Sequence, residues 1–364
     1  MENYNSIMSW LVLSQLSSIK PNKWVQLSEQ HNLTIDELCR LPSDDWLTIG
    51  IHPSIVEKRS KATHLAELAI HFLSKNSDVQ CTYYSASDYP QSLRLLSHPP
   101  AVLFIRGNNS NLHDRQLAIV GSRHASKNGQ YTAKSFAQDV AEQGIVITSG
   151  LARGIDSQAH LGALNASNGR TIAVLGCGID ICYPKYNQGL FDKIIQRNGT
   201  VVSEFLPNTP PRPHHFPCRN RIVAMLSTGV LLVEAKIRSG SLITCNLAAD
   251  MGKDVFAVPG NINHPLSEGA NWLIQQGAKL ITSSADILNE FNVYTVAEEK
   301  PDSKRKGLAI DPILDSVDYD VTPLYEIIKR SKLSSSDVLT ALLEHELQGL
   351  VTAVPGGYLK LRGE

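Results

Sequence analysis

The sequence predicts an α/β fold: an extended Rossmann-like, doubly wound and mostly parallel sheet covered by helices on both faces. Strand-like runs alternate with amphipathic stretches between residues 116 and 290, and the runs are continuously apolar. They are LAIV (117–120), IVIT (145–148), TIAVL (171–175), TVVS (200–203), GVLLV (229–233), DVFAV (254–258) and AKLI (278–281). Ligands of such sheets bind beyond the carboxyl ends of the strands, so we expect the function in the loops that follow these runs.

Residues 1–80 are predicted to form a separate helical domain. Trp10, Leu13 and Leu16 share one apolar helix face, and Thr34 and Glu37 have the spacing of a capping box. Two helices around residues 49–51 have the pattern of a degenerate helix-hairpin-helix, a module that can grip the DNA backbone. A plain helical bundle that docks partners fits the same pattern. The main domain is expected over 85–292, and its opening segment contains a strand at 102–105.

Beyond the main domain, the polar and charged residues 293–312 are predicted to form a linker. Residues 313–364 show two helical patterns and then the run GLVTAVPGGYLKLRG, which predicts a two-stranded wing that turns at Gly356 and Gly357. The arrangement is typical of a winged helix. Winged helices often bind DNA. Here Lys329, Arg330 and Lys332 are balanced by Asp337, Glu344 and Glu346, which favours protein docking or a weak DNA role.

Composition narrows the classes of function. The 364 residues carry a net charge of -1, so any polyanion site has to be a local patch. The six cysteines include no CxxC pair, and no histidine has metal-ligand spacing, so we expect no metal and reduced thiols in a cytoplasmic protein. No run approaches the ~18 apolar residues of a membrane span, and no signal peptide is expected.

The loop after the first run has the sequence GSR and leads into a helix that we expect Asn128 to cap. Gly121 lets the backbone approach a ligand, Ser122 supplies a hydroxyl, and Arg123 adds a planar fork of charged donors. These groups suit a phosphate at a helix N-terminus. A tight turn with an exposed arginine explains the same residues equally well.

The loops after the second and third runs add further candidates. SGLARGID carries Arg153, while Asp156 and His160 could form an acid–base pair; structural roles are favoured for both, because no nucleophile lies at a defined spacing. GCGIDICYPKYN sets Lys185 between two tyrosines, so that rings can stack on bases while the cation meets a phosphate. The third glycine of a GxGxxG fingerprint is missing, and we therefore expect no dinucleotide cofactor.

The loop after the fourth run, SEFLPNTPPRPHHFPCRNRI, contains no acid beyond the glutamate near its start. Arg212, Arg219 and Arg221 bring positive charge, Phe216 brings a ring, and the prolines make the loop stiff. A cationic loop that is already ordered loses less conformational entropy when it binds a polyanion. Some of these arginines could instead anchor the following helix, and we expect Asn220 to be structural.

The fifth run ends in VEAKIRSGSLIT, where Lys236 precedes an SGS sequence at a helix start, again an anion-binding arrangement. Five successive loops at one sheet edge thus carry glycine, serine, arginine or lysine, a concentration that packing alone does not explain. The residues that we expect to bind single-stranded DNA are Gly121, Ser122, Arg123, Arg153, Lys185, Phe216, Arg219, Asn220, Arg221, Lys236, Ser239, Gly240 and Ser241.

Several long motifs closely resemble those of the DprA, or Smf, family of bacterial DNA-processing proteins. They are GSRxxS, SGLARGID, GCGIDxxYPKYN, FPCRNRI, VEAxxxSGSLIT and VPGNIxxPxSxGxNxLI, in this order between about residues 85 and 290. The resemblance implies an N-terminal SAM-like helical domain, a Rossmann-like domain that binds single-stranded DNA, and a C-terminal winged helix. By the same resemblance, Arg123 is the principal phosphate contact, Lys185 a second, and Arg219 with Arg221 a further cationic wall.

The resemblance also implies a role. Family members protect single-stranded DNA taken up in natural transformation, load RecA recombinase onto it, and form homodimers through the Rossmann-like domain. The sequence contains no P-loop, paired metal-binding carboxylates or activated nucleophile, so we expect binding and handover without catalysis, cofactor or ATP hydrolysis.

Two other classes of function remain open. Nucleoside-monophosphate phosphoribohydrolases of the lysine-decarboxylase-like group share the extended Rossmann architecture and resemble one another in a PGGxGTxxE motif. The corresponding stretch here, AKIRSGSLIT after Glu234, lacks the catalytic glutamate, so we expect no hydrolase activity. The third class is an interaction protein whose winged helix binds another competence factor.

Overall fold

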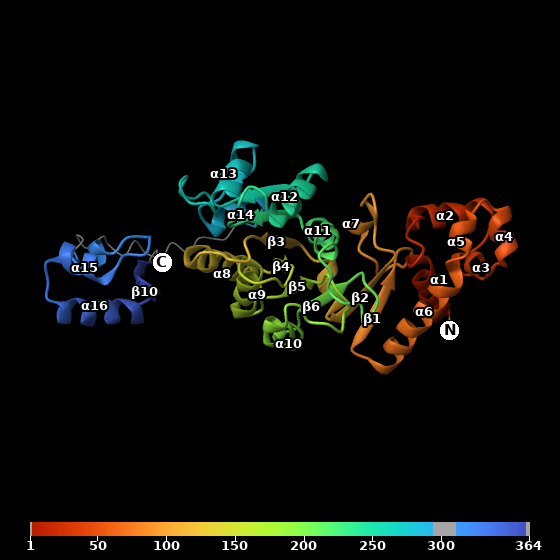
Figure 1. Cartoon of the computed structure of the whole chain (residues 1–364), viewed down its shortest axis with the longest axis horizontal. Coiled ribbons are helices and arrows are strands. Elements are labelled where there is room, and N and C mark those ends of the chain that lie inside the picture. Colours follow the sequence, from red (N-terminus) through yellow and green to blue (C-terminus); the bar gives the residue numbers. More distant parts are fainter. Residues whose placement is uncertain (1, 294–310, 362–364) are drawn as a thin grey trace. The chain divides into compact units, whose positions relative to one another are not determined.

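The computed structural model describes residues 2–293 and 311–361 (Figure 1). The chain divides into two compact units, Met1–Tyr294 and Thr295–Glu364. Residues 294–310, which make up most of the predicted linker, lie outside the described residues. None of the described helices is long and apolar enough to cross a membrane.

A nine-stranded sheet organises the first unit. Its strands are β1 (Val79–Tyr83), β2 (Val102–Gly107), β3 (Gln116–Val120), β4 (Val146–Ser149), β5 (Thr171–Val174), β6 (Thr200–Ser203), β7 (Gly229–Leu232), β8 (Asp254–Ala257) and β9 (Lys279–Leu280). They lie in the order β1-β2-β6-β5-β4-β3-β7-β8-β9. The strands from β6 to β9 in this order run parallel, while β1 and β2 are antiparallel at one edge. The predicted mostly parallel, doubly wound sheet is confirmed.

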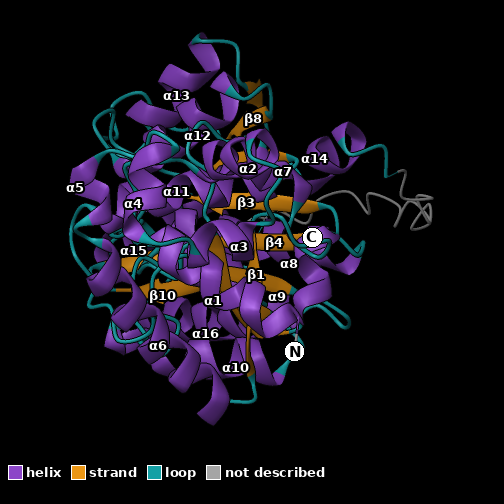
Figure 2. Cartoon of the chain, turned by 90° about the vertical axis from the view of Figure 1, so that its right-hand side faces the viewer, coloured by secondary structure: helices purple, strands orange, loops and turns teal. Residues whose placement is uncertain are grey.

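Helices cover both faces of the sheet, as continuously apolar strands require. One face carries α8 (Lys127–Glu142), α9 (Ile155–Asn165), α10 (Gln188–Gln196) and α14 (Ser284–Glu290); the other carries α7 (Gln91–Arg94), α11 (His215–Leu226), α12 (Gly240–Asp250) and α13 (Glu268–Gln275). Figure 1 shows α12 and α13 above the strands and α10 below them. In Figure 2 the strands, drawn in orange, lie among the helices that enclose them.

The winding direction changes between β3 and β7, which are neighbours in the sheet. The chain leaves β3 toward β4 on one side, and leaves β7 toward β8 on the other. The loops that follow β3 and β7 therefore diverge and open a crevice at the carboxyl edge, the usual ligand position in a doubly wound sheet.

Six helices precede the sheet. They are α1 (Glu2–Ser14), α2 (Pro21–Gln30), α3 (Ile35–Arg40), α4 (Ser43–Thr48), α5 (Pro53–Val56) and α6 (Arg59–Lys75). Trp10, Trp24 and Trp46 are fully buried among them, and the predicted capping box of Thr34 and Glu37 is confirmed at the start of α3.

The N-terminal helices also pack against the sheet region. The Trp10 indole N–H donates to the Ser85 hydroxyl at 3.0 Å, and its ring centroid lies 5.8 Å from that of Tyr84. The helices and the sheet thus form one compact unit, and the predicted division near residues 80–85 falls inside it.

The second unit contains the predicted wing. It is built from a 3-10 turn (Leu314–Ser316), α15 (Leu324–Ser331), α16 (Ser335–Leu347), β10 (Val351–Val354) and β11 (Gly357–Lys360). Ile327, Val338 and Leu342 form its buried core, and β10 pairs with β11 in an antiparallel hairpin. Gly356 has a φ of 99°, a backbone conformation that favours glycine, and forms the turn of the wing.

Candidate nucleic-acid interface

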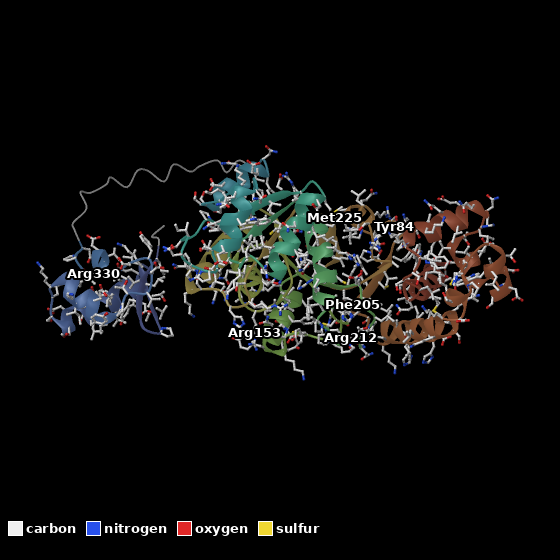
Figure 3. All side chains as sticks on the ribbon, turned by 45° about the horizontal axis from the view of Figure 1, so that its top comes forward. Tyr84, Arg153, Phe205, Arg212, Met225 and Arg330 are labelled. Carbon is white, nitrogen blue, oxygen red and sulfur yellow. The ribbon has the colours of Figure 1, made fainter. Side chains whose placement is uncertain are left out.

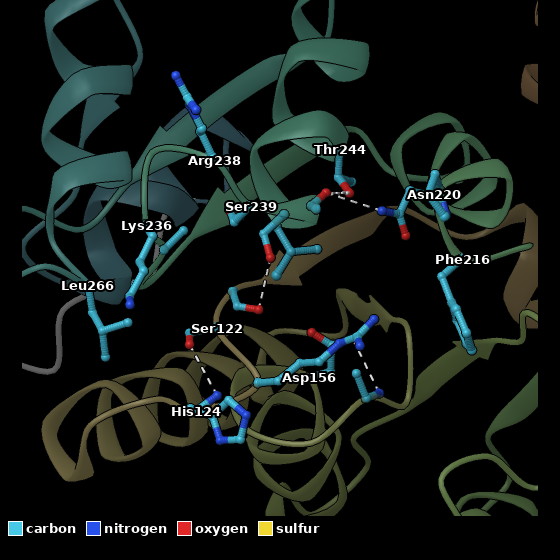
Figure 4. Close-up of a pocket in the computed structure, with 18 of the residues that line it drawn as sticks. Ser122, His124, Asp156, Phe216, Asn220, Lys236, Arg238, Ser239, Thr244 and Leu266 are labelled. Atoms are coloured by element: carbon cyan, nitrogen blue, oxygen red, sulfur yellow. Dashed lines mark hydrogen bonds between the residues drawn. The ribbon is translucent and has the colours of Figure 1, made fainter. Parts of the chain in front are cut away.

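A cavity of about 560 Å³ lies at the carboxyl edge of the sheet, where the loops after β3 and β7 diverge (Figure 4). The predicted site residues that line this pocket are Gly121, Ser122, Arg123, Phe216, Arg219, Asn220, Lys236, Ser239, Gly240 and Ser241. Figure 4 shows Lys236 and Ser239 across the pocket from Ser122 and His124, with Phe216 at a third side. The topology therefore brings together side chains from three separate loops.

Hydrogen bonds between loops form the base of the pocket. The Ser241 hydroxyl donates to the Gly121 carbonyl at 2.8 Å, and the Ser122 amide donates to the Glu234 carbonyl at 2.7 Å. A Cβ at Gly121 would lie 2.5 Å from the Ile155 side chain, so only glycine fits at this turn. The GSR turn is consequently held rigidly against β7 and α9.

Two helix starts border this base. At α8, Ser126 is the cap: its hydroxyl accepts from the Gly129 amide at 3.0 Å and donates to the Glu234 carboxylate at 2.5 Å. The expectation that Asn128 caps this helix is wrong. At α12, Ser239 is the cap, and the first residues of that helix line the pocket. The Glu234 carboxylate already occupies the start of α8, so it is the backbone amides at the start of α12 that favour an anion in the pocket.

The charge of the pocket is mainly positive. Arg123, Lys236 and Arg238 line it and are exposed to solvent. Among the described lining residues, the one acid is Asp156, which is 7% exposed and accepts from the Gly150 amide at 3.2 Å. Burial raises the pKa of the Asp156 carboxyl, while the Arg219 charge opposes that rise. Three solvent-exposed cations thus line the pocket, where an anion can reach them.

Arg219 lies beneath the pocket as an anchor. It is 4% exposed, and its guanidinium donates to the Gly150 carbonyl at 2.7 Å and also to the Val174 carbonyl. Burial lowers the Arg219 pKa, and Asp156 works against that shift. The guanidinium thus holds the loops after β4 and β5 in place. Its charge adds to the positive potential of the pocket. The expectation that Arg219 contacts DNA is corrected, because its side chain is buried.

Arg221 does not line the pocket. Its guanidinium is paired with the Glu204 carboxylate, and both side chains are largely buried. Burial raises the pKa of Glu204, and Arg221 opposes that rise. The expectation that Arg221 adds a free charge is wrong, because this internal ion pair neutralises it.

A row of rings and cations leads out of the pocket. The Arg123 guanidinium lies 5.6 Å from the Phe216 ring centroid, and the Phe216 and Tyr183 centroids are 5.5 Å apart. In a second pair, the Arg153 guanidinium lies 5.3 Å from the ring centroid of Tyr186, three residues after Tyr183 in the sequence. Such alternation suits a single strand, since every base offers a π face for stacking and every nucleotide a phosphate.

Arg153 and Lys185 do not line the pocket. Lys185 is exposed on the 3-10 turn Lys185–Asn187, between the two tyrosines in sequence. In Figure 3, Arg153, Phe205 and Arg212 are labelled in the lower half of the first unit. The predicted site residues thus divide into a pocket group, this outer pair, and Arg221 apart from both.

Some lining residues were not among the predicted site residues. His124 and Arg238 both line the pocket. A sequence signal existed for each, because His124 directly follows the GSR turn and Arg238 lies two residues after Lys236.

Asp156 and His160 have the structural roles that the sequence favoured. His160 is fully buried, and its Nδ1 lies 2.7 Å from the Thr171 hydroxyl oxygen. Within residues 2–293 and 311–361, no three histidine, cysteine, aspartate or glutamate side chains are grouped to hold a metal ion.

Comparison with known proteins agrees with this architecture. Residues 80–292 match the family model of DNA recombination-mediator protein A, and residues 299–357 match that of the DprA winged helix domain. The chain is 43% identical to Protein Smf of Escherichia coli K12 over 75% of each chain. It is 49% identical to DNA processing protein DprA of Streptococcus pneumoniae R6, over 56% of this chain and 71% of that protein.

Two solved structures are similar to this one. The X-ray structure of DprA from Streptococcus pneumoniae has a TM-score of 0.65 and 37% identity, covering 78% of this chain and 95% of that chain. DNA processing protein A from Helicobacter pylori, whose structure addresses its single-stranded DNA binding mode, has a TM-score of 0.53 and 30% identity, covering 58% of this chain and 96% of that one. The chain therefore belongs to the DNA recombination-mediator protein A family, the DprA or Smf proteins.

Proposed function

We propose that this chain binds single-stranded DNA along the carboxyl edge of its sheet. The observation that carries the proposal is the row that begins in the pocket with Arg123 and continues through Phe216 and Tyr183. The single-stranded DNA binding addressed in the Helicobacter pylori structure supports the same function here.

Each part of the interface has a task in this proposal. One phosphate is held in the pocket by the backbone amides at the start of α12, together with the side chains of Arg123 and Lys236. Phe216 and Tyr183 stack on the neighbouring bases, and Lys185 and Arg153 meet the following phosphates. Paired bases in a duplex are already stacked on one another, so single strands are preferred.

In the cell, we propose that the chain acts in the cytoplasm during natural transformation, where it protects incoming single strands and loads RecA recombinase onto them. Binding through phosphates is reversible and salt-dependent, which allows a strand to be handed over without ATP hydrolysis. The active form is a homodimer made through the Rossmann-like domain. Sedimentation velocity of the full chain tests the dimer, and growth of RecA filaments on strands coated with single-strand binding protein tests the loading.

The proposed mechanism contains no catalytic step. Glu234 leaves β7 beside the pocket, but its carboxylate accepts from the Ser126 amide at 2.8 Å and from the Ser126 hydroxyl. These bonds hold the start of α8, which leaves this carboxylate poorly placed to act as an acid or base on a nucleotide.

Fluorescence anisotropy with a labelled oligothymidylate, measured across salt concentrations, tests DNA binding. Loss of one charged phosphate contact costs about 1.5–3 kcal/mol, so Arg123→Ala weakens binding at least tenfold. It also makes the slope of log affinity against log salt shallower by about 0.7. Arg197→Ala is the matched control, because Arg197 is exposed and lies just before β6, at the opposite edge of the sheet. Equal affinities for wild type and Arg123→Ala would remove this pocket from the DNA site.

A further inference from the structure

The outer face of α16 in the second unit is unusually apolar. Leu339, Leu343 and Leu347 are 44%, 59% and 82% exposed. Residues four apart lie on the same side of a helix, so these leucines form one stripe, about 12 Å long at 1.5 Å per residue. Single exposed leucines are common on protein surfaces, whereas a continuous stripe marks an interaction site.

The stripe is not needed to hold α16 in place. Another face of the helix packs inward through Val338, Leu342 and His345, which are all buried. The His345 Nε2 also lies 2.9 Å from the Asp311 carboxylate. Among the described residues of the second unit, the buried core therefore contains none of these three leucines.

The surroundings of the stripe are acidic. Glu344 and Glu346 are exposed beside it on the same helix. Residues 311–361 contain eight Asp and Glu residues against four Lys and Arg residues, a net charge of -4 with histidine neutral. α16 directly precedes the wing, the place of the helix that enters the major groove in DNA-binding winged helices. α16 contains no lysine or arginine to contact a phosphate, and the negative charge of residues 311–361 opposes the binding of a duplex.

We propose that this stripe is a docking site for an amphipathic helix of a partner protein, with an apolar face flanked by lysine and arginine. The leucines bury the apolar face, and Glu344 and Glu346 select the basic flanks. A second copy of α16 is disfavoured as the partner, since it would bring glutamates against glutamates.

The test uses the full chain and two synthetic 18-residue helical peptides with leucines at four-residue spacing. One carries lysines at its flanking positions, and its matched partner carries glutamates there. We expect the lysine peptide to bind at least tenfold more tightly in fluorescence anisotropy. Leu343→Ser weakens its binding at least tenfold, and Glu344→Gln weakens it and flattens its salt dependence. Leu68→Ser is the control, because Leu68 is a similarly exposed leucine, at 53%, on α6.

Unchanged binding of the lysine peptide in Leu343→Ser, with the fold intact by thermal melting, overturns the proposal. If a short DNA duplex binds to the wild type and this binding is lost in Leu343→Ser, then α16 contacts duplex DNA and the proposal is wrong. Conversion of a dimer to a monomer by Leu343→Ser in sedimentation would show that a second copy occupies the stripe. Leu343→Ser is expected to leave single-stranded DNA binding unchanged. This measurement distinguishes the docking site on α16 from the proposed DNA site in the pocket.

Discussion

The Arg123 guanidinium lies 5.6 Å from the centroid of the Phe216 ring. Arg123 follows the central strand β3, whereas Phe216 comes from the first turn of α11, after β6. Their contact exists because parallel strands end at the same edge and the winding direction changes beside β3. A charged donor and a stacking surface thus meet at one point, where a nucleotide could use both.

The ring of Phe216 is expected to contribute stacking without charge. Phe216→Ala should lower the affinity for oligothymidylate by about 1–3 kcal/mol, the usual value of one base–aromatic stack. The slope against salt should stay as in wild type, because no cation is removed. Anisotropy titrations measure both quantities. Tyr131→Ala, at an exposed ring on α8, is the control, and a changed slope for Phe216→Ala alone would argue against stacking.

Arg219 is expected to support the fold more than to contact DNA. Arg219→Ala leaves the Gly150 and Val174 carbonyls without their donor and removes the charge opposite Asp156. Breaking such a buried set costs about 3–5 kcal/mol of unfolding free energy. Urea denaturation measures the loss, and Arg123→Ala serves as the comparison, with an expected change within about 0.5 kcal/mol for an exposed side chain. Equal stabilities of the two variants would contradict the role of an anchor.

Glu234 is expected to be structural. Glu234→Gln keeps one acceptor for Ser126 but removes the charge at the start of α8, which should cost about 0.5–2 kcal/mol of stability. Neither wild type nor this variant should release free base from nucleoside monophosphates, as measured by chromatography. Base release by pure wild type that disappears in Glu234→Gln would instead assign this chain to the phosphoribohydrolases.

His160 should make stability depend on pH. Burial lowers its pKa to about 3 from 6.5, so below pH 6.5 the unfolded chain binds a proton that the native chain does not. Unfolding free energy is therefore lost as pH falls from 6.5 toward 3, by up to about 1.4 kcal/mol per pH unit from this group. Urea titrations at pH 7, 6 and 5 measure this dependence. His160→Gln should be less stable at pH 7 and show a flatter dependence; the same dependence in both chains would exclude His160 as its source.

Sequence patterns predicted the central strands well, because strands buried on both faces are continuously apolar. β1 was not predicted, since VQCTY in Val79–Tyr83 has exposed and half-buried positions at a sheet edge. Its pairing with β2 comes from across the sheet and leaves no local signal.

The pocket could be predicted as a cluster of loops, but not the task of each arginine. Arg219 and Arg221 are two positions apart on α11, which turns their side chains to different sides of the helix. Arg219 donates to backbone carbonyls at the ends of β4 and β5, whereas Arg221 forms an ion pair with Glu204. Likewise, Ser126 caps α8 in place of Asn128 because Glu234, far away in sequence, binds its amide and hydroxyl.

Photo-crosslinking of an oligothymidylate that carries 5-iodouracil locates the bound strand directly. After irradiation of the full-length complex, mass spectrometry identifies the modified residues. We expect crosslinks to Phe216 and Tyr183, and both should be lost when Arg123→Ala is used at the same protein concentration. Crosslinks confined to the second unit, or to the sheet edge near Arg197, would contradict it.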